Sequence, residues 1–215
     1  YAFQNNKLTS VTIPDSVTHI GDSAFSSNLL TGVEIGNSVT HIGDSAFGEN
    51  QLTSVSIPAS VTYLSGFNDN QLTSVEIPGN VTEIGWYAFY GNRLTSVIIP
   101  DNVTRIAYSA FANNQLTGLT IGSSVANIAN AAFANNQLTS ITIPSSVTHL
   151  SGFNGNQLES ITIPNSVVEI GTEAFYDNQL ANLIIGNSVT GIGRSAFENN
   201  LLTDVTIPDS VETIG

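Results

Sequence analysis

The 215-residue sequence contains no cysteine and very few basic residues. Without cysteine there is no disulfide framework, no thiolate zinc site and no cysteine nucleophile. Only 4 Lys and Arg residues accompany 17 Asp and Glu residues, which gives a net charge of -13. Nucleic acids and anionic membranes are bound by clustered Lys and Arg, so we expect no nucleic-acid partner. No apolar run approaches the roughly 20 residues of a membrane span, so we expect no membrane insertion.

What the sequence contains in abundance is one short unit, repeated in register. A leucine opens each unit, and successive leucines are 22 or 20 residues apart. Nine complete units cover residues 8–201, with partial units at both ends. We expect a single solenoid over residues 1–215 that is an excerpt of a longer protein. The leucines are Leu8, Leu30, Leu52, Leu72, Leu94, Leu116, Leu138, Leu158, Leu180 and Leu202.

Apolar residues recur at fixed positions of each unit, as in LTSVTIPDSVTHIGDSAFSSNL, residues 8–29. Stacked units bury such residues in continuous columns, at about 1.5–3 kcal/mol per covered side chain. The L-x-x-V-x-I segment alternates with period two and predicts a short strand that ends at Pro or Gly. The S-V-T-x-I segment is a candidate for a second extended segment. The G-D-S-A-F segment predicts a single helical or 3₁₀ turn.

An asparagine stands two residues before each leucine and forms what we call the asparagine column. The Asn side chain carries both donor and acceptor groups. Stacked in a column, these groups can satisfy the turn backbone that a solenoid buries. We therefore interpret the column as structural rather than as a row of ligand-binding amides. It contains Asn6, Asn28, Asn50, Asn70, Asn92, Asn114, Asn136, Asn156, Asn178 and Asn200.

Two units are two residues short and replace the I-G-x-x-A-F turn with L-S-G-F, at residues 64–67 and 150–153. These positions are 86 residues apart, and the neighbouring units match at the same offset, as residues 83–85 match 169–171. The array therefore contains a duplicated block of four units. We expect the missing residues to flatten the outer turn at both places.

The pattern L-x-x-V-x-I-P-x-S-V-x-x-I-G-x-x-A-F, as in residues 8–25, resembles the BspA-like leucine-rich repeats of bacterial and some protist surface proteins. The resemblance extends over essentially the whole chain. It implies an α/β leucine-rich-repeat solenoid, a curved right-handed superhelix with a parallel sheet on its concave face and short turns or helical turns on the other. It also implies adhesion to a protein or glycan on another cell or in the matrix, and no catalytic residues. The scarcity of Lys beside abundant Asn, Ser and Thr fits the same extracellular or cell-surface location.

Histidines and aspartates offer the only candidates for metal chemistry. His19, His41 and His149 share one unit position, and the first two lie on adjacent rungs, roughly 5 Å apart by strand spacing. A metal there lacks a third close ligand, so a tolerant exposed position is favoured. Asp22 and Asp44 also share a column, where a solvated pair is favoured over a shared cation. No G-x-S-x-G motif or phosphate-binding loop occurs, and we expect no enzyme activity, no metal and no cofactor.

The residues that break the repeat are the candidates for a binding site. Trp86 and Tyr108 share a column on adjacent rungs, so they could stack. Aromatic residues together with Arg are typical of binding hot spots, and cation–π contacts are a further expectation. The alternative is that these side chains cover the outer surface or reflect drift between units. The predicted ligand-binding set is Tyr63, Trp86, Tyr87, Tyr90, Arg93, Arg105 and Tyr108.

The sequence as a whole favours a non-catalytic binding or adhesion module. One alternative is a structural spacer or a scaffold that self-associates through uncapped ends. Another is ice binding, because Thr recurs in several columns. Glu34, Glu76, Ile98 and Ile184 interrupt the outward column of the L-x-x-V-x-I segments, so Thr as a favourable strand-surface residue is the preferred interpretation.

Overall fold

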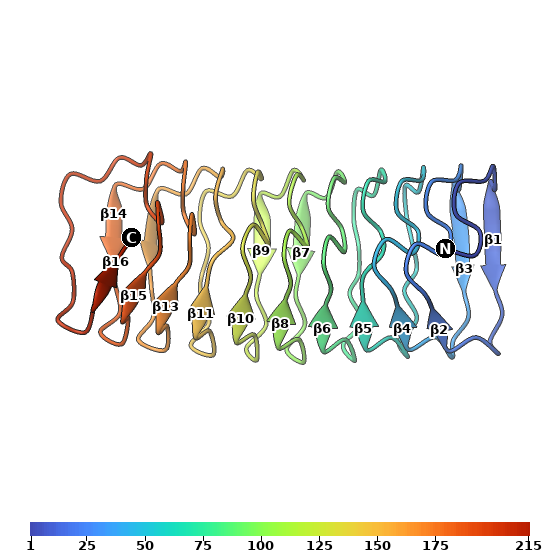
Figure 1. The fold of residues 1–215 in the computed structure, drawn as a ribbon, viewed down its shortest axis with the longest axis horizontal. Coiled ribbons are helices and arrows are strands. Elements are labelled where there is room, and N and C mark those ends of the chain that lie inside the picture. The colour runs from blue at the N-terminus through green and yellow to red at the C-terminus, as the bar shows by residue number, and fades with distance from the viewer.

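The computed structural model describes all of residues 1–215 as a parallel β-solenoid, a stack of coils with one rung for each repeat. In Figure 1 successive rungs lie side by side along an axis that is close to straight in this view. The rungs consist of short strands and turns. The structure contains no helix with the length and apolar character needed to cross a membrane.

One long face of the stack is a continuous parallel sheet of ten strands, built from the V-T-x-I segments. Each strand pairs with the same position of the next rung, so that His19 lies opposite His41 and Ile20 opposite Ile42. The second residue of each strand is a buried Ile or Leu, except at Ile214. The strands are β2 (His19–Ile20), β4 (His41–Ile42), β5 (Tyr63–Leu64), β6 (Glu83–Ile84), β8 (Arg105–Ile106), β10 (Asn127–Ile128), β11 (His149–Leu150), β13 (Glu169–Ile170), β15 (Gly191–Ile192) and β16 (Thr213–Ile214).

The strand predicted for every L-x-x-V-x-I segment forms in only three pairs of rungs, so the long sheet belongs to the other segment. In Figure 1 these paired strands point in the opposite direction to those of the ten-stranded sheet. The pairs are β1 (Ser10–Ile13) with β3 (Gly32–Ile35), β7 (Ser96–Ile98) with β9 (Gly118–Thr120), and β12 (Ser160–Thr162) with β14 (Asn182–Ile184).

A contact between Gly and Pro at the end of this segment explains where the strands pair. In each of the three pairs, a unit whose segment ends in Pro is followed by a unit that has Gly at the same position. Gly122 packs on Pro100 so closely that an added Cβ would lie 2.6 Å from the Pro100 carbonyl carbon. Elsewhere the following unit carries Pro, whose ring takes up this space and keeps the two segments from closing into a ladder. The other two contacts are Gly36 on Pro14 and Gly186 on Pro164.

The prediction of a helical or 3₁₀ turn at G-D-S-A-F is wrong. The third residue of each full-length turn, such as Ser23 or Tyr87, has a left-handed φ between 51° and 56°. In four of these turns the amide of that residue donates to the next rung rather than within its own turn, as Ser23 does to the Asp44 carbonyl at 2.9 Å; the others are Tyr87, Ser109 and Glu173. Because this hydrogen bond points along the solenoid axis, the turn cannot continue into a helix.

The interior consists of apolar columns that run the length of the stack. Every phenylalanine belongs to one of them, and successive rings are near parallel, with centroids 5.2 to 5.8 Å apart. From Phe47 to Phe175 these rings are fully buried, as are the leucines from Leu30 to Leu180. Such burial is the main favourable contribution to the stability of the stack.

The asparagine column lies beside the phenylalanines and is nearly fully buried from Asn28 to Asn178. Asn114 donates through Nδ2 to the carbonyls of Phe111 at 3.1 Å and Ala112 at 3.2 Å in its own turn, and of Phe89 at 2.9 Å in the preceding rung. Its Oδ1 accepts the Leu94 amide at 3.0 Å. Three acceptors share two N–H groups, so the hydrogen bonds are partly bifurcated. The same bonds recur at Asn28, Asn50, Asn70, Asn92, Asn136, Asn156, Asn178 and Asn200.

We predict that Asn114→Ala lowers the free energy of unfolding by about 2–4 kcal/mol, because the substitution leaves the buried Leu94 amide and nearby carbonyls without partners at roughly 1–3 kcal/mol each. Urea unfolding followed by circular dichroism measures the loss. Gln115→Ala, at the adjacent exposed position, is the matched control and should change stability by less than about 0.5 kcal/mol. Equal effects of the two substitutions would contradict the structural role of the column.

The contact between Gly122 and Pro100 generates a second prediction. Gly122→Ala should destabilise the protein by about 1–3 kcal/mol, because the new methyl group would overlap the Pro100 backbone. Gly79→Ala is the control, since an added Cβ at Gly79 meets no atom within 4 Å. Thermal unfolding of both variants checks the difference, and a stable Gly122→Ala variant would show that the two segments can separate without cost.

Candidate binding surface

Three tyrosines pack together on the turns beside the ten-stranded sheet. The Tyr87 ring contacts Tyr90 and Tyr108 edge-on, each at a centroid distance of 5.5 Å. We call Tyr87, Tyr90 and Tyr108 the tyrosine cluster. Tyr87 is 39% exposed and Tyr108 43%, while Trp86, next along the chain, is 54% exposed. These residues place a large apolar surface in contact with solvent.

The stacking predicted between Trp86 and Tyr108 is wrong, because Tyr108 packs on Tyr87 instead. The backbone explains the difference. Tyr87 has a φ of 54°, and its amide donates to the Tyr108 carbonyl at 3.0 Å, which makes residue 87 the neighbour of residue 108. Desolvation, followed by the adjacent Tyr108 and Tyr90 side chains, raises the pKa of the Tyr87 hydroxyl above its usual value.

Tyr63 belongs to a different part of the surface, on β5 of the ten-stranded sheet. Its ring stacks on His41 at a centroid distance of 4.4 Å, and its hydroxyl donates to Asp44 Oδ1 at 3.1 Å. Burial, together with the Asp44 carboxylate, raises the pKa of this phenol well above its usual value. The Tyr63 ring and hydroxyl are thus both occupied by contacts within the protein.

The two arginines of the predicted set do not join the tyrosine cluster. Arg105 on β8 forms a salt bridge with Glu83 on β6 at 3.1 Å, and both side chains are well exposed. Such an exposed pair contributes little to stability. Arg93 is exposed and forms neither a salt bridge nor a side-chain hydrogen bond. Neither arginine stacks on an aromatic ring, so the expected cation–π contacts are absent.

The histidine and aspartate pairs are arranged along the same sheet. His19 stacks on His41 at 5.7 Å, and no group of three or more His, Asp or Glu side chains is arranged to hold a metal ion. Asp22 Oδ1 accepts the Asp44 amide at 2.9 Å. The two carboxylates therefore make different contacts. Asp22 accepts a backbone amide of the next rung, and Asp44 accepts a hydrogen bond from the Tyr63 hydroxyl.

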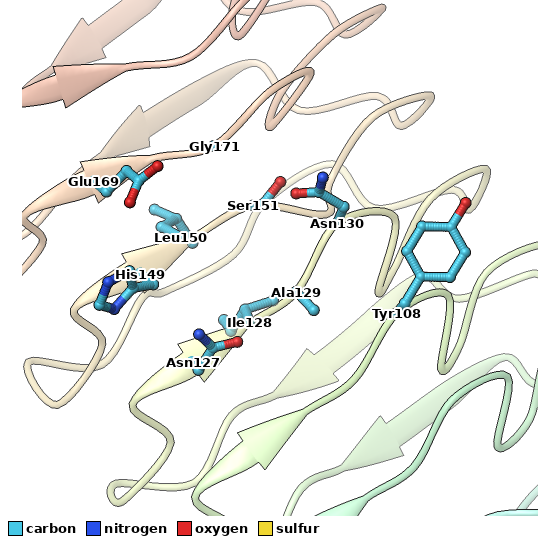
Figure 2. Close-up of a pocket in the computed structure, with 10 residues that line it drawn as sticks. All are labelled: Tyr108, Asn127, Ile128, Ala129, Asn130, His149, Leu150, Ser151, Glu169 and Gly171. Carbon is cyan, nitrogen blue, oxygen red and sulfur yellow. The ribbon is translucent and has the colours of Figure 1, made fainter. Parts of the chain in front are cut away.

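A polar hollow of about 360 Å³, which we call the notch, opens on the ten-stranded face next to Tyr108 (Figure 2). It lies at the second short unit, where two residues are missing from the turn and Gly152 adopts a φ of 91°. The shorter unit is visible in the sequence, but the hollow beside it is not. The signal was the L-S-G-F turn preceded by His149 rather than by Tyr63. The notch is lined by Tyr108, Asn127, Ile128, Ala129, Asn130, His149, Leu150, Ser151, Glu169 and Gly171.

Solved structures share the solenoid fold. A leucine-rich repeat protein from Eubacterium ventriosum is 25% identical, with a TM-score of 0.55 over 89% of this chain and 51% of that one. A leucine rich cell surface protein from Faecalibacterium prausnitzii is 26% identical, with a TM-score of 0.50 over 93% and 83%. The pneumococcal vaccine antigen PcpA is 21% identical, with a TM-score of 0.55 over 94% and 51%. This chain spans about half the length of the first and third of these proteins.

Comparison with known sequence families identifies the type of repeat. A profile described as the BspA type leucine rich repeat region, with 6 copies, matches residues 1–116, 65–152 and 150–215. These matches together cover the whole chain. No curated protein sequence is detectably similar. The chain belongs to the BspA-type leucine-rich repeat family.

Proposed function

We propose that this chain is a non-catalytic binding module of a cell-surface or secreted protein, and that it contacts a protein or glycan partner through the tyrosine cluster and Trp86. The observation that carries the proposal is the exposure of these large aromatic rings at one place, with Trp86 54% exposed. Exposed aromatic patches mark interaction sites, and Trp and Tyr are enriched among the residues that dominate binding energy.

The duplicated block supports this assignment, because a comparison of its two copies separates the residues required for the fold from those that differ on the surface. Both blocks make the same rung contact, since the Glu173 amide donates to the Arg194 carbonyl at 2.9 Å as Tyr87 does to Tyr108 at 3.0 Å. The turn therefore forms equally well without the aromatic side chains of Trp86, Tyr87 and Tyr108, while Tyr90 has a counterpart in Tyr176. The positions that correspond to Trp86, Tyr87 and Tyr108 hold Thr172, Glu173 and Arg194.

The surface location rests on the family and on one relative. The repeat is of the BspA type, and the similar protein from Faecalibacterium prausnitzii is described as a cell surface protein. The acidic composition and the scarcity of Lys agree with a protein exposed outside the cell. These observations support the location, and the tyrosine cluster supports binding there.

The threonine columns do not favour ice binding. The hydroxyls of Thr40 and Thr62 donate to the carbonyl of the preceding rung, at 3.1 and 3.2 Å, and Thr82, Thr104 and Thr190 do the same. These hydroxyls are therefore used in exposed hydrogen bonds between rungs. The competing function is therefore a structural spacer or self-associating scaffold, for which the aromatic side chains would be dispensable.

The double variant Trp86→Ala, Tyr108→Ala should weaken partner binding at least about tenfold, as expected for removal of hot-spot side chains. Binding of labelled protein to whole cells is measured by flow cytometry, on untreated cells and on cells treated with protease or glycosidase. Loss after one treatment identifies the partner as protein or glycan. The change in emission of Trp86, the only tryptophan, reports contact at the site directly.

The matched control is the double variant Thr172→Ala, Arg194→Ala, which alters the corresponding turns of the second block. It should bind as the unchanged protein does. Equal binding by both double variants would rule out the tyrosine cluster as the site. Absence of cell binding by the unchanged protein, together with concentration-dependent association in sedimentation, would favour the scaffold.

A further inference from the structure

Each of the two short units lacks two residues of the turn beside the ten-stranded face, and we call the resulting gap the break. The side chains around the break differ between the two units. In the first block Tyr63 covers the break, and its hydroxyl lies so close to Gly85 that a Cβ at that glycine would collide with it. In the second block His149 replaces Tyr63. The atoms nearest to an added Cβ at Gly171, which corresponds to Gly85, would be those of Ser151 at 3.0 Å and Asn130 Oδ1 at 3.3 Å, with no aromatic ring among them. The space that Tyr63 fills is thus open in the second block.

The polar groups around the open notch are only partly used by internal contacts, since His149 Nδ1 lies 3.0 Å from the Thr148 hydroxyl oxygen. Asn127 and Asn130 make no hydrogen bond to the protein through their side chains, whereas their counterparts in the first block, His41 and Asp44, contact Tyr63. The hydroxyl of Ser151 donates to the Thr172 carbonyl at 3.3 Å. Figure 2 shows Asn130 and Ser151 pointing toward one another at the centre of the notch.

The lining defines the chemistry of a ligand. Two amides and an imidazole present both donors and acceptors, and Glu169 adds a carboxylate acceptor. No Lys or Arg lines the notch, and the chain carries a net charge of -13, so an anionic ligand is excluded. Ile128 and Leu150 are buried in the core, so Tyr108 and Ala129 supply the apolar part of the lining. A volume of 360 Å³ is at the lower end of the roughly 300–1,000 Å³ of small-molecule sites.

We propose that the notch binds one uncharged sugar ring of a glycan. A pyranose ring presents hydroxyl groups around its rim, which need donors and acceptors, and apolar C–H faces, which suit the ring of Tyr108. Because Tyr108 both lines the notch and contacts Tyr87, a glycan seated there would continue onto the tyrosine cluster. The inference rests on the proposed binding function and narrows its partner to a carbohydrate.

The test uses the whole chain labelled with ¹⁵N and four neutral probes, which are glucose, galactose, mannose and N-acetylglucosamine. At least one sugar should shift the side-chain amide signals of Asn127 and Asn130. For a dissociation constant on the order of 1 mM, the shift should be close to saturation at about 10 mM sugar. The anionic probes glucose 6-phosphate and N-acetylneuraminic acid should shift neither. Binding of no neutral sugar at these two residues would overturn the proposal.

Two variants and one control sharpen the test. His149→Tyr restores the residue that fills the corresponding space in the first block, so it should fold and weaken sugar binding at least tenfold. His19→Tyr adds the same ring to the same sheet at a full-length unit and should leave binding unchanged. Asn130→Ala removes an exposed amide without internal contacts and should also weaken binding. Undiminished binding by both His149→Tyr and Asn130→Ala would overturn the proposal.

The outcomes separate this inference from the proposed function. A sugar that shifts the NMR signals of Trp86 and Tyr87 but not those of Asn127 and Asn130 would bind at the tyrosine cluster and not in the notch. Loss of cell binding in the Trp86→Ala, Tyr108→Ala variant, combined with no sugar binding, would identify a protein partner. In both cases the notch proposal fails while the binding function stands.

Discussion

The hydrogen bonds of the asparagine column set the constraint on which the rest of the solenoid depends. The turn beside the phenylalanines faces the interior, where its carbonyl groups have neither water nor a sheet partner. Each Asn supplies the missing donors to two rungs at once and accepts the amide of the Leu that opens its own unit, as Asn114 does for Leu94. The column therefore aligns the rungs as well as closing each turn.

This alignment is maintained across the short units. Leu52 donates to Asn70 and Leu138 to Asn156, both 18 residues away, with the same geometry that joins residues 20 apart elsewhere. Because the interior contacts keep their positions, the two missing residues must be taken from the outer turn. Gly66 and Gly152, with left-handed φ values of 94° and 91°, make the shorter turn. The break on the ten-stranded face follows from the interior constraint, and the residue before the turn decides whether that break is filled.

Regular stacking also explains where functional information lies. Inward positions repeat because each must fit the rungs above and below it, while outward positions of the same sheet vary from His19 to Glu83 to Gly191. The duplicated block shows this separation within one molecule. The tyrosine cluster and the open notch occur on different blocks but meet at Tyr108, so the block-to-block differences form one contiguous surface.

The inward columns and the partners needed by the asparagine column could be predicted from the sequence, because each depends only on the spacing within one unit. The pairing of strands could not be derived from the same alternation. Both extended segments of a unit are apolar and short enough to be strands, and the choice depends on whether a Gly such as Gly122 can touch the Pro of the rung before it. The prediction of a helical turn was wrong for a similar reason, since hydrogen bonds to the next rung compete with those inside the turn.

The sequence by itself determined the period, the buried columns, the family and the list of residues that depart from the repeat. Only the tertiary structure decided which of those residues meet. Shared columns place Trp86 above Tyr108, but the left-handed backbone at Tyr87 and its hydrogen bond to residue 108 make Tyr87 the contact. Likewise, the sequence shows two equal deletions, and only side-chain packing shows that Tyr63 closes one and His149 leaves the other open. Contacts between columns depend on turn dihedral angles and side-chain reach, which a one-dimensional repeat does not contain.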